Sequence, residues 1–148
     1  MGFTEAIRTV LTQKYATFSG RASRSEYWWF ALFTYLIGFA LLILALAAGA
    51  SSDQQGGVSS LVVAITVVGG LFVLAIFLPL LSLQVRRFHD RNISGWWYLA
   101  LIVLGMVPYI GGITGLAITI ISVFRGTEGP NKFGPDPLRP EARAEVFA

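Results

Sequence analysis

The sequence contains no cysteine, one histidine and few charged residues. Asp, Glu, Lys and Arg make up 13% of its 148 residues, which is about half the share found in a soluble domain. Without cysteine, the chain can form no disulfide, thiolate zinc site, iron–sulfur cluster or cysteine nucleophile. The single histidine, His89, also excludes the paired-histidine zinc motifs. We therefore expect neither a metal nor a cofactor.

Apolar residues take the place of the missing charge. They reach 55% of the chain, and the mean hydropathy is +0.67. So few polar residues cannot cover the surface of a folded chain of this size in water. The composition excludes disordered, collagen-like and coiled-coil classes. It predicts an all-α integral membrane protein.

Charged residues divide the chain into long uncharged runs. The first two, 27–50 and 58–85, are each long enough to cross a hydrocarbon core of about 30 Å as a helix. The connector between them, 51–57 (SSDQQGG), is short and rich in turn-forming residues. The pattern predicts two full transmembrane helices that form an antiparallel hairpin.

The third uncharged run, 92–124, has a poor helical sequence at its centre. One continuous helix of this length would measure about 50 Å, which is too long for the bilayer at ordinary tilt. Pro108 and the glycines around it favour a break. We predict two short segments, 92–107 and 109–124, forming a thin or re-entrant hairpin within a membrane domain at 27–124. The alternative is one kinked span.

All 11 Lys and Arg residues lie in three places: before the first run, at 86–91, and in the tail. The positive-inside rule places such segments in the cytoplasm. A hairpin at 92–124 then gives four membrane segments with both termini cytoplasmic, whereas one span would put the tail outside. The net charge of +3 and the pI of about 9.6 are thus an orientation signal. We expect no nucleic-acid binding.

The segments flanking the membrane domain have different characters. Residues 1–26 carry apolar side chains at helical spacing, which predicts an amphipathic helix that lies on the membrane surface or packs against the membrane helices from the cytoplasmic side. The tail, 125–148, is rich in Gly and Pro, which excludes regular structure. Paired tryptophans suited to interfacial anchoring stand at the starts of two membrane segments: Trp28, Trp29, Trp96 and Trp97.

Three polar blocks interrupt or flank the apolar runs. They are FSGRASRSEYWW (18–29), RRFHDRNISGWW (86–97) and GTEGPNKFGPDP (126–137). Together they resemble domain-of-unknown-function family 805, small bacterial inner-membrane proteins with the pattern F-x-G-R-x-x-R-x-E-Y-W, then R-R-x-H-D and S-G/A-W-W, then G-T-x-G-x-N-x-[FY]-G-P-D-P. The resemblance implies a multi-pass protein of the bacterial inner membrane. It implies no particular biochemical role.

Arginines and carboxylates stand close together within these blocks. An unpaired charge at a low-dielectric interface is costly, and an arginine can pair a carboxylate through two parallel hydrogen bonds. We therefore predict a cytoplasmic cap of arginine–carboxylate pairs with the tail laid across it. Ordinary solvated charges, or a site for an anionic lipid headgroup, remain alternatives. The candidate residues are Arg21, Arg24, Glu26, Arg86, Arg87, His89, Asp90, Arg91 and Asp136.

The sequence offers little support for catalysis or ion coupling. His89 has Asp90 beside it but no second histidine, and no nucleophile-elbow motif is present. The uncharged runs also lack the ionisable residues that mark ion and proton paths. We predict a non-enzymatic accessory protein that contacts the bilayer and a membrane-protein partner or a second copy, either through small-residue helix faces or through its cytoplasmic arginine cap. The alternatives are a small channel or transporter for a neutral or anionic solute, and an enzyme using the His89 region.

Overall fold

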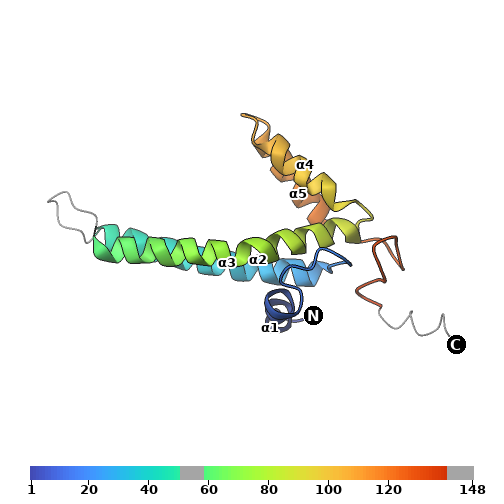
Figure 1. Ribbon diagram of the computed structural model, residues 1–148, viewed down its shortest axis with the longest axis horizontal. Coiled ribbons are helices and arrows are strands. Elements are labelled where there is room, and N and C mark those ends of the chain that lie inside the picture. The colour runs from blue at the N-terminus through green and yellow to red at the C-terminus, as the bar shows by residue number, and fades with distance from the viewer. Residues whose placement is uncertain (51–58, 140–148) are drawn as a thin grey trace.

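The computed structural model describes residues 1–50 and 59–139, and the described part is helical with no named strand (Figure 1). The predicted connector at 51–57 and the end of the tail lie outside these residues. The prediction of an all-α chain with two long apolar helices is confirmed. In chain order the elements are α1 (Phe3–Arg8), a π-helical turn η1 (Thr9–Gln13), α2 (Arg24–Ala50), α3 (Ser60–Asp90), α4 (Gly95–Gly105) and α5 (Gly111–Val123).

Helices α2 and α3 run side by side as one long antiparallel pair (Figure 1). Of the described helices, these two are long and apolar enough to cross a membrane. Their side chains point largely outward: Leu46 is 65% exposed and Leu74 is 73% exposed. Exposed apolar surface on this scale is unfavourable in water but suits contact with lipid chains. The structure is thus consistent with an integral membrane protein.

Both long helices extend further toward the charged end than their uncharged runs predict. Helix α2 begins at Arg24 instead of Tyr27, and α3 continues to Asp90, so the predicted loop at 86–91 is helical almost to its end. The prediction assumed that charged residues mark the point where helix gives way to solvated loop. Here the charges are buried in pairs, so the helices continue. Asn92, with φ of 60°, then ends α3 in the left-handed conformation that Asn tolerates.

Pro79 lies inside α3, where it cannot donate the backbone hydrogen bond that the carbonyl of Ala75 would otherwise accept. The hydroxyl of Tyr15 donates to that carbonyl instead, at 2.5 Å. One turn later the buried hydroxyl of Ser82 lies within hydrogen-bonding distance of the carbonyls of Lys14 (3.3 Å) and Tyr15 (3.2 Å). The segment after η1 is therefore hydrogen-bonded to the part of α3 that surrounds Pro79.

The N-terminal segment packs against the long helices. Its regular structure ends at Gln13, whereas the apolar spacing extends to Phe18. Val10 is fully buried in a small core with Phe30 of α2 and Leu83 of α3, and the ring of Phe3 meets Trp29 edge-on at 5.8 Å. The N-terminal segment thus contacts both long helices.

The third uncharged run forms two helices that pack on each other and project from the charged end of the α2–α3 pair (Figure 1). At the usual rise per residue, α4 is about 16 Å long and α5 about 20 Å. The turn between them requires glycine, because a Cβ added to Gly111 would lie 2.8 Å from the carbonyl oxygen of Gly105. Tyr109, at the tip, has a φ of 70° and is fully exposed.

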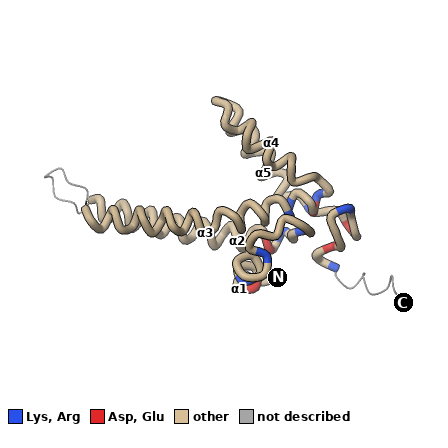
Figure 2. Tube along the Cα trace, in the orientation of Figure 1, with Lys and Arg blue, Asp and Glu red and all other residues tan. Residues whose placement is uncertain are grey.

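Figure 2 shows the charge distribution that results from this arrangement. Among the described residues, Lys, Arg, Asp and Glu gather where α2 begins, where α3 ends, and along the N-terminal segment and the tail. The distal halves of α2 and α3 and the tip of the α4–α5 hairpin carry none. The candidate site must therefore lie at the charged end.

Candidate functional site: a buried arginine cap

A cluster of buried ionic side chains joins the ends of α2 and α3 to the tail. We call it the arginine cap. Two of its members, Arg86 and Arg87, are both 0% exposed. Arginine is rarely buried unless it is paired, because removing its charge from water is costly. The cap consists of Arg21, Glu26, Arg86, Arg87, His89 and Asp90.

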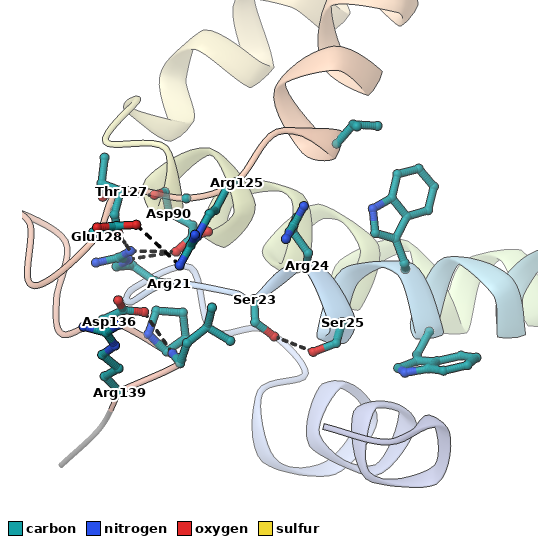
Figure 3. A pocket seen from close by; sticks show the side chains of 16 residues that line it. Arg21, Ser23, Arg24, Ser25, Asp90, Arg125, Thr127, Glu128, Asp136 and Arg139 are labelled. Carbon is teal, nitrogen blue, oxygen red and sulfur yellow. Dashed lines mark hydrogen bonds and ion pairs between the residues drawn. The ribbon is translucent and has the colours of Figure 1, made fainter.

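Asp90, 3% exposed, is the centre of the cap. Its Oδ1 accepts a hydrogen bond from Nε of Arg21 at 2.9 Å (Figure 3). Its Oδ2 accepts one from Nη1 of Arg87. Both carboxylate oxygens are thus engaged by guanidinium groups, and two buried cations share one buried anion.

Arg87 connects three separate segments. Besides pairing with Asp90, it donates to the carbonyl of Ser122 from Nε at 3.0 Å, to that of Ala22 from Nη1 at 3.3 Å, and to that of Phe124 from Nη2. The last carbonyls of a helix have no partner within it and carry partial negative charge, so a cation there is favourable. Arg87 therefore fixes the end of α5 and the segment before α2 to the end of α3.

Arg21 likewise binds backbone carbonyls, in this case those of the tail. Its Nη2 and Nη1 donate to the carbonyls of Thr127 at 2.5 Å and Gly129 at 2.6 Å. The amide of Thr127 donates to the carbonyl of Asp90 at 2.8 Å, and the side-chain amide of Asn131 donates to that of His89 at 2.9 Å. These bonds supply a partner for the carbonyl of Asp90 and a second donor for that of His89, which also accepts from the amide of Asn92. The tail lies across the end of the helix because its backbone completes the cap.

Gly126 marks the closest contact between the tail and the cap. A Cβ at this position would lie 2.0 Å from Oδ2 of Asp90, so only glycine lets the backbone pass. Gly126, Thr127 and Asn131 belong to the third polar block, but the sequence alone predicted no role for any of them. The only signal available was their place in the motif, because their partners are mainly backbone atoms.

The imidazole ring of His89 is held by Gly20 and Phe133. Its Nδ1 lies 3.1 Å from the carbonyl oxygen of Gly20, and its ring stacks on Phe133 with the centroids 3.9 Å apart and the planes 5° from parallel. Its sequence neighbour Asp90 pairs with arginines and not with the imidazole. Among the described residues there is also no group of three metal-binding side chains. These contacts fix the position of the imidazole ring between Gly20 and Phe133.

A second ion pair lies beside the first. Nη1 of Arg86 donates to Oε1 of Glu26 at 2.5 Å, with both side chains almost wholly buried. The carbonyl of Arg86 accepts from the amide of Ala22 at 3.1 Å. Nε and Nη2 of Arg86 are buried and find no partner among the described residues. Since two donors lack acceptors, the attraction to Glu26 must offset a large desolvation cost.

Three predicted cap residues lie outside it. Arg24 is exposed in the first turn of α2. Arg91 donates to the carbonyl of Arg125 and lies over the ring of Phe124 at 5.7 Å. Asp136 was expected to pair with an arginine, but in the described structure its carboxylate accepts backbone N–H bonds from the tail itself, those of Gly129 (3.2 Å) and Leu138 (2.9 Å). The reason is proximity: a short turn brings those amides to the carboxylate.

The paired tryptophans lie at the same end of the molecule as the cap. Trp28 and Trp29 occupy the start of α2, and Trp96 and Trp97 the start of α4. All four side chains are exposed. Helix α4 can begin this close to α3 because Gly95 has no side chain: a Cβ there would lie 2.5 Å from the side chain of Val85.

The sequence matches known proteins over the region that contains the cap. Residues 15–135 match the family described as protein of unknown function (DUF805). Inner membrane protein YhaI of Escherichia coli (strain K12) is 35% identical over 125 residues, covering 84% of this chain and 89% of that relative. Inner membrane protein YhaH of the same strain is 38% identical over 125 residues, covering 84% of this chain and 90% of the relative. No solved structure matches the chain significantly.

Proposed function

This chain belongs to the DUF805 family, as its three polar blocks indicated, and we propose that it is a non-enzymatic accessory protein of the inner membrane. In this role it binds a partner membrane protein through its outward-facing helices, and the arginine cap holds those helices at a fixed angle. Family membership supports the integral membrane location, because the relatives are named inner membrane proteins. The accessory role rests on the geometry of the cap.

The observation that carries the proposal is that the charged residues of the motifs are engaged in holding the fold together. Asp90 pairs with Arg21 and Arg87, Glu26 pairs with Arg86, and His89 is stacked and hydrogen-bonded. A catalytic acid or base must be able to reach its substrate. A buried carboxylate that already accepts from two guanidiniums has no such freedom. The cap therefore suits a structural role.

We further propose that four segments enter the membrane, with both termini in the cytoplasm. Helices α2 and α3 span the bilayer, and the shorter α4–α5 hairpin enters from the cytoplasmic side. The cap supports this topology because it gathers the segment before α2, the end of α3 and the tail at one end of the molecule. A phosphatase reporter fused after Pro137 should be inactive and a fluorescent reporter should be active. Periplasmic phosphatase activity there would refute the topology.

Small residues on the outer helix faces support partner contact. A Cβ added to Gly112 or Gly115 of α5, or to Gly49 of α2, would meet nothing within 4 Å. Gly111, by contrast, is used within the hairpin turn against Gly105. Open small-residue faces let the backbone of another helix approach closely, which is the usual basis of helix association in lipid.

Cross-linking and pull-down from native membranes, with the tail tagged, tests the accessory role. We expect one membrane protein to be recovered in fixed stoichiometry, and its recovery to fall when Gly115→Leu fills the open face of α5. Leu116→Ile, an exposed position on the same helix, is the matched control and should change nothing. If no partner is recovered and proteoliposomes transport a neutral or anionic solute, the channel interpretation replaces the accessory one.

A further inference from the structure

The structure separates the arginines into two groups. Arg21, Arg86 and Arg87 are buried in the cap and bound to carboxylates, so their guanidinium groups are already engaged within the protein. Arg24 and Arg125, by contrast, are exposed and line a cavity of about 570 Å³ between the start of α2, the end of α5 and the tail (Figure 3). Arg21 also lines this cavity, but it is bound to Asp90. A headgroup contact expected from the whole cluster is therefore confined to this second group.

These two arginines are available to a ligand. Arg24 is exposed, and its side chain has no hydrogen bond or ion pair with the part of the chain that the structure describes. Within the described part of the chain, the side chain of Arg125 pairs with Glu128 alone, at 3.4 Å, and the two side chains are 60% and 74% exposed. An ion pair that open to water contributes little, so an incoming anion can displace it. Arg139 lines the cavity as well.

The acidic residues of the cavity do not neutralise these cations. Asp90 faces it but is already shared between two cap arginines. The carboxylate of Asp136 accepts two backbone N–H bonds. Glu128 is the one remaining acidic side chain of the lining, against the exposed Arg24, Arg125 and Arg139. The cavity therefore favours an anion.

Part of the lining is apolar and belongs to the proposed membrane helices. Trp28 and Trp29 come from the second turn of α2, and Val123 is the last residue of α5. Tryptophan side chains prefer the depth of the lipid headgroups. A ligand in this cavity would thus have charge at the Arg24–Arg125 end and hydrocarbon at the tryptophan end. A phospholipid has this distribution and a free inorganic anion does not.

We propose that this cavity binds the phosphodiester of an anionic phospholipid, with Arg24 and Arg125 as its phosphate ligands and Trp28 and Val123 against the first part of the acyl chains. Guanidinium groups pair with phosphate oxygens through parallel hydrogen bonds. Basic pockets between membrane helices on the cytoplasmic side bind anionic headgroups by this chemistry. The site borders the cap, whose Arg21 and Asp90 also line the cavity; it rests on the proposed topology but not on the accessory role.

Native mass spectrometry of the full chain, titrated with phosphatidylglycerol or phosphatidylcholine, tests the proposal. We expect phosphatidylglycerol to bind more tightly. Arg24→Gln should weaken that binding about fivefold, and Arg24→Gln combined with Arg125→Gln about 25-fold, if each arginine contributes as a basic residue near an anionic membrane does. The matched control removes two charges from the N-terminal segment, Arg8→Gln with Lys14→Gln, and should change affinity less than about twofold.

Three results would overturn the proposal. One is equal affinity for phosphatidylglycerol in the wild type and the Arg24/Arg125 double variant when both retain the same helical content. Another is equal affinity for phosphatidylcholine and phosphatidylglycerol. The third is full displacement of the lipid by inorganic phosphate, which would make this a site for a free anion. If the double variant does not fold, Arg24→Gln alone decides, since its side chain has no partner within the described structure.

Discussion

The arginine cap makes its strongest prediction at Asp90. The substitution Asp90→Asn keeps the shape of the side chain but removes the only negative charge that Arg21 and Arg87 contact in the described structure. The amide can still accept one hydrogen bond. Its NH2 group, however, would face the N–H donors of one of the two guanidiniums, both of which are almost fully buried. The variant therefore leaves buried positive charge uncompensated.

Breaking a buried ion pair by removing one partner costs about 3–5 kcal/mol, most of which is the penalty for leaving the other charge unpaired. Here one carboxylate serves two arginines, so we expect Asp90→Asn to fall in the upper part of that range. Folded proteins are typically stable by about 5–15 kcal/mol. The variant should accumulate poorly in the membrane and unfold at a markedly lower temperature in detergent.

Glu128→Gln is the control for this experiment. It also removes one negative charge from an ion pair, but in the tail and at a position where the side chain is 74% exposed. An exposed pair contributes at most about 1 kcal/mol, so this variant should match the wild type in abundance and unfolding temperature. If Asp90→Asn and Glu128→Gln behave alike, the cap does not hold the fold together, and the charges are solvated in the membrane-bound protein.

Two further substitutions test how the cap and α3 are built. Gly126→Ala should lower the free energy of unfolding by about 1–3 kcal/mol because the added Cβ would overlap the carboxylate of Asp90. The control, Gly70→Ala, is at an open helical position, so it should leave the midpoint of thermal unfolding unchanged or raise it. Equal midpoints for the two variants would refute the close contact. Tyr15→Phe should cost about 1 kcal/mol by leaving the carbonyl of Ala75 without its donor. The exposed Tyr35→Phe is its control, and equal loss in both would show that the bond to α3 is unimportant.

The membrane helices could be located from the sequence because a span permits almost no charge. Runs 27–50 and 58–85 became the bodies of α2 and α3. Their cap-side ends could not be located in the same way. A charged residue normally marks the edge of a span because water must solvate it. Arg86, Arg87 and Asp90 solvate one another and the carbonyls around them, so the helix continues through all three.

The residues of the candidate site could also be selected from the sequence, but their partners could not. Glu26 and Arg86 are 60 positions apart, and Arg21 and Asp90 are 69 apart, so the choice of partner depends on how the helices cross. Many acceptors are backbone carbonyls, such as those of Ser122 and Thr127. A carbonyl is present at every position, so no residue type identifies it in advance.

The guanidinium of Arg87 joins three parts of the described fold: the end of α3, the end of α5 and the segment before α2. Arg87 donates to carbonyls just before α2 and at the end of α5, while its pairing with Asp90 holds it at the end of α3. The α4–α5 hairpin is too short to be oriented by a long packing surface like the one between α2 and α3. This buried side chain therefore helps to set the angle of the hairpin, together with the hydrogen bond from Gln84 to Ser122 and the contact between the rings of Phe88 and Tyr98. Lysine could supply the charge at this position, but not a planar group whose donors reach several segments at once.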